Sequence, residues 1–219
     1  MPMCFSATAS FSASALLGVT GLACLQVAEK KQDKLLASLP LLFSIQQFIE
    51  GLLWLYHANG MLTYVLAYAF LFFAFLLWPI YVPLVAYLFE TDQGRKKILK
   101  YVTWAGVAGS MILAAILIHR HLEVTVVQNS LCYIVDFPYQ NLGIGIYIAI
   151  TVGALMISTN QVLRMFGLAA FLSASVAWQF YRHAFTSVWC FFCALLSMTL
   201  YWGLLMKHNK TLDKIAKMF

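Results

Sequence analysis

The chain has 219 residues, of which 63% are hydrophobic and 10% are charged, and its mean hydropathy is +0.82. Soluble domains carry about 25% charged and about 45–50% apolar residues, so this composition excludes an ordinary soluble domain and indicates a membrane protein. The formal net charge of +6 would suggest nucleic-acid binding in a soluble protein, whereas in a membrane protein its distribution between loops is what matters. We therefore expect a lipid bilayer as the environment and no nucleic-acid partner.

Seven apolar segments are long enough to cross a bilayer, which takes about 20 helical residues. They are predicted at residues 5–27, 35–56, 61–89, 98–118, 142–158, 165–181 and 185–206. Pro79 and Pro83 predict a kink in the third segment, because proline breaks the backbone hydrogen-bond pattern of a helix. The start of the chain lacks the basic leader of a cleavable signal peptide, so we expect the first segment to be retained. The whole chain, 1–219, is thus predicted to be one all-helical transmembrane domain that ends in a basic tail at 207–219.

The distribution of lysine and arginine predicts the orientation. Twelve of these residues fall on one side of the predicted spans, and only Arg120 and Arg182 fall on the other. Cytoplasmic loops carry the excess of positive charge. The sequence therefore predicts a multi-pass protein of the cell membrane with its N-terminus outside and its C-terminus in the cytoplasm.

The only long loop, residues 122–140, lies on the predicted outer side. It reads EVTVV, then Gln128-Asn129-Ser130, then LCYIV, and this alternation around a turn predicts a short β-hairpin. An irregular surface loop is the alternative. We expect the hairpin to lie over the outer mouth of the bundle.

The second span contains the main candidate site. Gln46, Glu50, Trp54 and His57 follow one another at spacings of four, four and three, which places them on one face of a helix. A carboxylate inside a span is costly and usually has a functional reason. Glu50 could be balanced by Arg182 or a histidine, by a bound cation, or by a proton of its own.

Other polar residues gather at the same predicted depth, on the outer side. This pattern predicts an outward-facing polar cavity formed by the first, second, sixth and seventh spans, although polar residues also simply anchor helix ends. The candidate ligand-binding residues are Gln46, Gln47, Glu50, His57, Gln179, Arg182 and His183. A small cation or polar solute is the expected ligand.

Two enzymatic alternatives use the same side of the membrane. Cys190 and Cys193 form a CxxC motif, which suggests a thiol–quinone oxidoreductase, although small residues at this spacing also serve helix packing. A metal-dependent hydrolase is the other alternative, because histidine, glutamate and cysteine can ligate a transition metal. Its candidate ligands are Glu50, His57, His183 and Cys4. No HExxH or HxxxH pair supports them.

Small residues recur every fourth position on two predicted helices. They are Ser10, Ser14 and Gly18 on the first span, and Gly106 and Ser110 on the fourth. Such faces allow two helices to approach closely. They are candidates for contacts within the chain and for assembly of a homo-oligomer.

Four stretches of the chain carry a family resemblance. MCFSATASF at the start, LLFSIQQFIEGLLWL in the second span, WPIYVPL and VWCFF resemble a family of bacterial integral membrane proteins described as a domain of unknown function. The resemblance implies a multi-pass protein of the bacterial inner membrane and supplies no activity or catalytic residue.

Two other seven-helix families do not fit the motifs. Rhodopsins hold retinal on a lysine in the middle of the last helix, but the last predicted span has no lysine before Lys207. Membrane hydrolases related to ceramidases carry a His-x-x-x-His pair on a late helix, where this chain has only His183. We therefore expect no retinal, and the sequence favours a binding or transport site over an enzyme without deciding between them.

Overall fold

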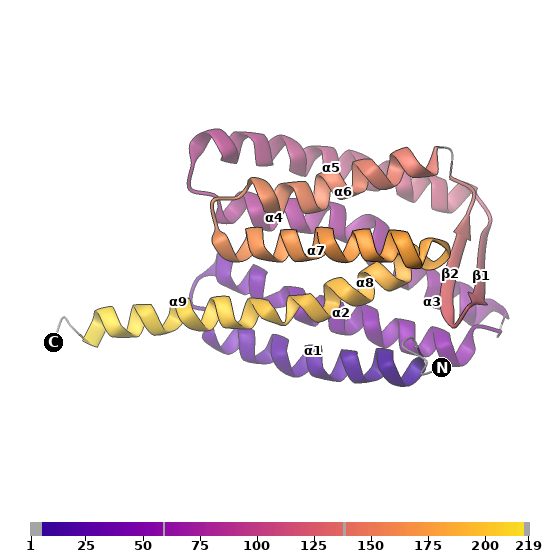
Figure 1. Ribbon diagram of the computed structural model, residues 1–219, viewed down its shortest axis with the longest axis horizontal. Helices are drawn as coiled ribbons and strands as arrows, with labels where there is room; N and C mark the ends of the chain where they lie inside the picture. The colour runs from indigo at the N-terminus through magenta and orange to yellow at the C-terminus, as the bar shows by residue number, and fades with distance from the viewer. Residues whose placement is uncertain (1–5, 59, 138, 217–219) are drawn as a thin grey trace.

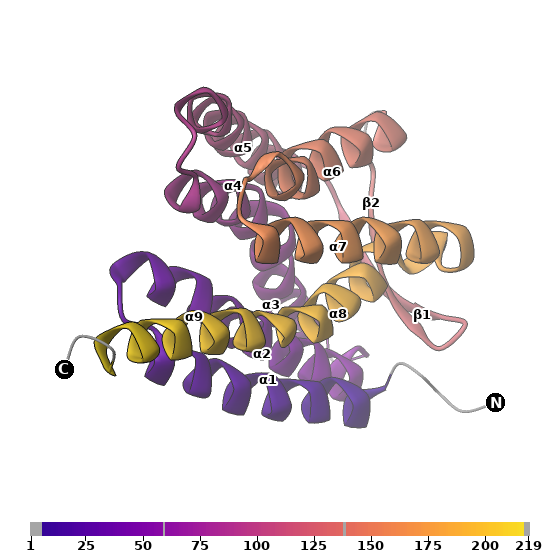
Figure 2. The same cartoon turned by 60° about the vertical axis from the view of Figure 1, so that its left-hand side comes forward.

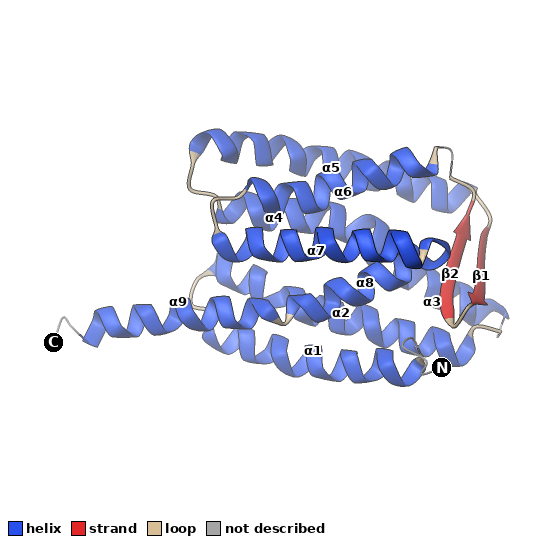
Figure 3. Cartoon of the chain, viewed as in Figure 1, coloured by secondary structure: helices blue, strands red, loops and turns tan. Residues whose placement is uncertain are grey.

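The computed structural model describes residues 6–58, 60–137 and 139–216 as a helical bundle with a small β-hairpin across one end (Figure 1). Seven helical segments in the described residues are long and apolar enough to cross a membrane. The predicted number of spans is therefore confirmed. Figure 3 shows the hairpin as the two strands against an otherwise helical chain.

The elements follow the predicted order closely. The first three spans are formed by α1 (Ala7–Val27), by α2 (Lys31–Tyr56), and by α3 (Gly60–Leu71), η1 (Phe72–Leu77) and α4 (Trp78–Phe89) together. The next elements are α5 (Gln93–His119), β1 (Leu122–Val127), β2 (Ser130–Val135), α6 (Gln140–Ile157) and α7 (Gln161–Phe180). The last span comprises η2 (Arg182–Ala184), α8 (Phe185–Ser197) and the first part of α9 (Thr199–Ala216).

The hairpin forms because its turn suits two adjoining strands. Gln128 and Asn129 both have positive φ angles, of 47° and 58°. Two such residues match the right-handed twist of antiparallel strands. β1 and β2 pair from Leu122 opposite Val135 to Val127 opposite Ser130, which confirms the predicted hairpin. One face of the hairpin packs on the bundle, where Leu131 is fully buried.

The third span contains a π-helical segment, η1, that ends two residues before Pro79. Trp78 N bonds to the Phe73 carbonyl, five residues earlier, and Pro79 has no N–H with which to continue this pattern to Ala74. The Tyr147 hydroxyl donates to the Ala74 carbonyl instead, at 2.5 Å. The prolines predicted a kink in this span. The structure has a π-helical segment upstream of Pro79, and the Tyr147 hydroxyl from α6 stabilises it.

Both predicted small-residue faces are used within the chain. Ser14 and Ser44 exchange side chain-to-carbonyl hydrogen bonds of 2.8 and 2.7 Å, which join α1 to α2. A Cβ atom at Gly106 would lie 1.9 Å from the Pro79 carbonyl oxygen, so α4 and α5 require glycine there. Ser110 donates to the Leu76 carbonyl at 3.0 Å. Assembly of copies would therefore need a surface other than these two faces.

At the end opposite the hairpin, Glu90 connects two turns. Its carboxylate accepts hydrogen bonds from the backbone N–H groups of Thr91, Asp92 and Thr159 and from the Thr159 hydroxyl, at 2.7–2.9 Å. Burial raises the pKa of this carboxyl, but the four hydrogen bonds outweigh it and lower the pKa to about 2. The α4–α5 turn is thereby joined to the α6–α7 turn.

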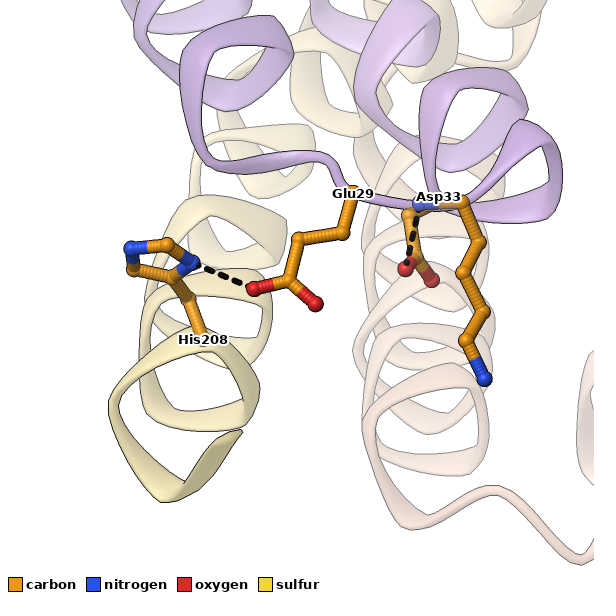
Figure 4. A network of polar contacts seen from close by, with 4 residues as sticks. Glu29, Asp33 and His208 are labelled. Carbon is orange, nitrogen blue, oxygen red and sulfur yellow. Dashed lines mark hydrogen bonds and ion pairs between the residues drawn. The ribbon is translucent and has the colours of Figure 1, made fainter. Parts of the chain in front are cut away.

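α9 continues beyond the bundle as a single helix (Figures 1 and 2). The helix is interrupted between Ser197, the last residue of α8, and Thr199, the first residue of α9. The hydroxyls of these two residues donate to the carbonyls of Ala194 and Leu196. His208 Nδ1 lies 2.9 Å from Glu29 Oε1, so α9 contacts the α1–α2 turn (Figure 4). The predicted tail at 207–219 thus begins as part of this helix, and its last three residues lie outside the described residues.

Candidate functional site

The candidate site is a polar cluster on one turn of α2. α2 is one of the seven candidate membrane spans, and in it Gln46 and Gln47 are fully buried and Glu50 is 2% exposed. Gly51 beside them has no Cβ, and a Cβ there would lie 2.7 Å from the ring of Phe11 on α1. α1 therefore packs tightly on α2 beside the cluster.

Three side-chain hydrogen bonds hold the cluster. Ser187 on α8 donates to Glu50 Oε1, and Gln47 Nε2 donates to Glu50 Oε2 at 3.1 Å. The Trp78 indole on α4 donates to Gln46 Oε1 at 2.9 Å, and its ring stacks on Phe43 with centroids 4.1 Å apart. Helices from three spans therefore meet at this turn of α2.

Two buried amide atoms in the cluster are unpaired among the described residues: Gln46 Nε2, a donor that lies beside Cys190, and Gln47 Oε1, an acceptor. Neither amide can be turned around without loss. Gln46 must offer its oxygen to the Trp78 N–H, and Gln47 must offer its nitrogen to the Glu50 carboxylate. Buried polar groups are nearly always paired, so this turn retains capacity for a polar ligand or a water molecule.

No lysine, arginine or histidine among the described residues forms an ion pair with Glu50. Arg182 was one of the candidate partners, but its guanidinium donates to Asn141 Oδ1 at 3.2 Å and lies 4.5 Å from the ring centroid of Trp178. Arg182 is solvent-exposed, whereas Glu50 is buried, so this candidate ion pair does not form.

Tyr133 of the hairpin lies close to the cluster. Its ring stacks on Phe70 with centroids 4.8 Å apart, and its buried hydroxyl has no hydrogen-bond partner in the part of the chain that the structure describes. Burial raises the pKa of Tyr133 well above its usual value, and the nearby side chains of Glu50, Cys190 and Cys132 raise it further. The hairpin therefore covers the cluster with an uncharged phenol.

Two adjoining cavities open at the same end of the bundle. The first, of about 110 Å³, is polar and is lined by residues of β2, α6, α7, η2 and α8, including Asn141, Arg182 and His183. The second, of about 280 Å³, is mainly apolar and is lined by η1, α5, α6, α8 and the hairpin region. Tyr133 and Thr186 line both cavities, and Cys190 lines the second. Thr186 and Cys190 flank Ser187, the hydrogen-bond donor to Glu50.

The helices that line these two cavities differ from those predicted to line the polar cavity. Residues of α1 and α2 line neither of the two, because those helices pack closely on each other through Ser14, Ser44 and Gly51. The space instead lies toward the third to seventh spans. The prediction that the first and second spans would form the cavity wall is therefore wrong for these two cavities.

The structure brings together only some of the predicted ligand-binding residues. Gln46, Gln47 and Glu50 form the buried cluster, and Arg182 and His183 line the polar cavity. His57 is exposed at the end of α2, with its Nδ1 3.0 Å from the Trp54 carbonyl, and Gln179 is exposed on α7. These two residues line neither cavity, because His57 lies at the exposed end of α2 and Gln179 lies on an exposed face of α7.

The predicted metal ligands do not converge. Residues 6–58, 60–137 and 139–216 contain no group of three histidine, cysteine or acidic side chains that could hold a metal ion. His57 and His183 stand apart from Glu50 on exposed helix ends. Cys4 lies outside the described residues.

The CxxC thiols lie deeper than a surface redox motif would. Cys190 is 7% exposed and Cys193 is half-buried, and both are free thiols. Cys190 faces the apolar cavity and lies beside Gln46. Cys190 therefore belongs to the surroundings of the polar cluster.

Three residues of the site were missed by sequence reasoning. Ser187 lies three positions before Cys190 of the CxxC motif, and the sequence pattern gave no reason to prefer it. Trp78 was read only as part of the proline-containing third span, and Tyr133 only as a hairpin residue. The sequence alone could not show that these polar atoms belong to the site, because this depends on the register of their helices and strand.

The comparison with known families agrees with the resemblance noted above. Residues 3–214 match a family model described as "Family of unknown function (DUF6629)". The chain belongs to this family. No curated protein and no solved structure matches it significantly. The family assignment covers nearly the whole chain and leaves the activity to be argued from the site.

Proposed function

We propose that this family member is a multi-pass protein of the bacterial inner membrane that binds a small cation or polar solute at Glu50. Its N-terminus and hairpin lie outside and its C-terminus lies in the cytoplasm, as the loop charges favour. The ligand approaches from the hairpin end of the bundle. Translocation of the ligand is a further step that binding at this depth would permit.

The observation that carries the proposal is a buried glutamate with no cationic partner among the described residues. A carboxylate in hydrocarbon costs several kcal/mol unless a proton or a cation neutralises it. Two hydrogen bonds, from Ser187 and Gln47, stabilise the ionised form only in part. A cation would remove the remaining penalty.

The unpaired amide atoms support a ligand with hydrogen-bonding groups. Gln47 Oε1 can accept from a ligand or coordinate a cation, and Gln46 Nε2 can donate to a polar group. Both atoms lie on the α2 turn that carries Glu50. A small ligand here would therefore meet two acceptors and one donor.

An enzyme remains the second candidate only in its thiol form. Cys190 lies against both the apolar cavity and the polar cluster, so a quinone-like ligand in that cavity could reach a thiol. Unchanged function in a Cys190→Ser variant would exclude this alternative.

The binding proposal is tested with the purified full chain in detergent. Sodium, potassium and methylammonium chlorides are titrated at constant ionic strength against N-methylglucamine, and the melting temperature and calorimetric heat are measured. A ligand that binds only the folded state raises the melting temperature. We expect at least one cation to do so in the wild type and in Glu123→Gln, a control at an exposed carboxylate on β1.

Glu50→Gln is expected to fold and to lose the response, because an amide preserves the shape and one acceptor but removes the charge. An equal response in Glu50→Gln, or none from any of the three cations in the wild type, would count against a cation site. Loss of the folded protein in this variant would indicate a structural role for Glu50. Uptake of the active cation into proteoliposomes then separates transport from binding alone.

A further inference from the structure

The two cavities form one amphipathic space with distinct ends. They share five lining residues: Tyr133, Gln140, Ile144, Phe185 and Thr186. The smaller cavity carries Arg182 and His183, and the larger one carries aromatic and aliphatic side chains. A polar mouth at the end of the bundle therefore continues into an apolar chamber between the helices.

The charge of the mouth is positive and unbalanced. Neither cavity has an aspartate or glutamate in its lining. Arg182 forms no ion pair with a carboxylate in the described part of the chain, and its planar group is held in place by Asn141 and Trp178. A held guanidinium with free N–H groups is suited to binding a phosphate.

The apolar chamber opens toward the lipid-facing side of the bundle. Ile112 of α5 lines it and is also 61% exposed on the helix surface. Gly143 of α6 lines it as well, and a Cβ atom at Gly143 would meet no atom within 4 Å. The chamber, at about 280 Å³, is far larger than the space of about 15 Å³ that one water needs. Its apolar lining is suited to a hydrocarbon chain.

The buried Tyr133 hydroxyl supplies an independent indication of a ligand. Tyr133 lines both cavities, at the junction between polar mouth and apolar chamber, and its hydroxyl, enclosed just behind this lining, has no hydrogen-bond partner among the described residues. A tyrosine with one apolar end and one polar end suits the position where a lipid head group meets its chains.

From these observations we propose that the joined cavities bind an anionic phospholipid of the surrounding membrane. Its phosphate lies at Arg182 and His183, its glycerol ester region at Tyr133, and one acyl chain in the chamber between α5, α6 and α8. The site is separate from Glu50, which lines neither cavity. Lipid binding and cation binding can therefore succeed or fail independently.

The test measures lipids retained by the delipidated full-length protein in native mass spectrometry. Dioleoyl phosphatidylglycerol is compared with dioleoyl phosphatidylcholine, and free glycerol phosphate is added as a competitor. We expect preferential retention of phosphatidylglycerol, because its head group has net negative charge whereas that of phosphatidylcholine has none. Equal retention of the two lipids, or displacement of lipid by free glycerol phosphate at the same concentration, would overturn the proposal.

Two pairs of variants locate the lipid. Arg182→Gln is expected to reduce phosphatidylglycerol binding by about fivefold, the effect of one basic residue at an anionic lipid. Arg182→Lys retains the charge and should largely restore binding, while Arg120→Gln, at the same end of the bundle, should leave it unchanged. An equal loss in Arg120→Gln would show only a general surface-charge effect and would overturn the site.

The second pair tests the chamber. Gly143→Leu places a side chain in the apolar space and is expected to reduce retention of both lipids. Gly145→Leu is the matched control, because Gly145 is also open but lines neither cavity. Undiminished retention in Gly143→Leu would place the acyl chain elsewhere and contradict the proposal.

Discussion

Glu50 and Glu90 are both 2% exposed, yet the protein surrounds them differently. Glu90 lies just outside the third span and accepts four hydrogen bonds, three of them from backbone N–H groups. Glu50 lies inside the second span and accepts two, both from side chains. The turns that Glu90 joins thus supply its hydrogen bonds. Glu50 has fewer hydrogen bonds and lies beside two unpaired amide atoms, so it can still bind a ligand.

The difference separates a structural carboxylate from a candidate binding carboxylate. Backbone donors are fixed by the fold, so a carboxylate held by them has a constant environment and its acceptor positions are occupied. Side-chain donors can rotate and exchange partners. Burial alone therefore does not identify a site, whereas incomplete pairing of a buried charge does.

The largest expected effect is on Glu90. Glu90→Ala should lower the free energy of unfolding by about 3 kcal/mol, because buried backbone donors lose their acceptor and the two turns separate. Asp136→Ala is the control, since the Asp136–Arg120 ion pair is exposed and should be worth less than about 1 kcal/mol. Denaturant-induced unfolding in mixed micelles measures both. Similar losses in the two variants would remove the contrast between a fully held and a surface carboxylate.

A smaller effect follows from pH. The pKa of Glu90 is about 2 in the folded protein, against a usual value of 4.5, so the unfolded chain binds more protons between these values. The stabilisation is therefore complete above pH 4.5 and declines as the pH falls toward 2. We expect a loss of about 2 kcal/mol, less than the whole shift would give because water at the membrane surface screens the turn.

Glu90→Gln provides the comparison for this acid-dependent loss. The amide does not titrate, so the variant should be less stable near neutral pH and should show a shallower decline below pH 4.5. Parallel pH profiles for the wild type and the variant would assign the acid sensitivity to other groups.

The smallest expected effect is on the cluster around Glu50. Ser187→Ala should lower the free energy of unfolding by about 1 kcal/mol, because polar contacts between membrane helices are modest in net energy. Ser175→Ala is the matched control, since Ser175 is exposed and its hydroxyl bonds only within α7, to the Phe171 carbonyl. A loss in Ser187→Ala as large as that in Glu90→Ala would make Glu50 a structural carboxylate after all.

Much of the fold could be predicted because membrane spans are encoded locally. Apolar length fixed seven spans, alternation around Gln128 and Asn129 fixed the hairpin, and small residues such as Ser14 and Gly106 marked close helix contacts. Each signal depends on neighbours within a few turns of one helix or strand. The π segment before Pro79 was less predictable, because it also depends on the Tyr147 hydroxyl from a distant helix.

The site was predicted in part. The helical face through Gln46 and Glu50 is a local property, and the structure buries both residues. The expectation that this face also brings His57 into the site did not hold, because His57 lies at the exposed end of α2. Arg182, one of several candidate partners of Glu50, bonds to Asn141 instead, because depth along the membrane does not determine which way a side chain faces.

The sequence by itself determined the membrane class, the number of spans, the hairpin and the presence of a carboxylate within the second span, since all of these follow from composition and short-range periodicity. Only the tertiary structure decided that Ser187 and Gln47 hold Glu50, that Arg182 lies elsewhere, and that cavities open toward α5 and α6. The physical reason is helix rotation. Which face of each helix meets its neighbours is set by packing over the whole bundle, and one position along a helix turns a side chain by about 100°.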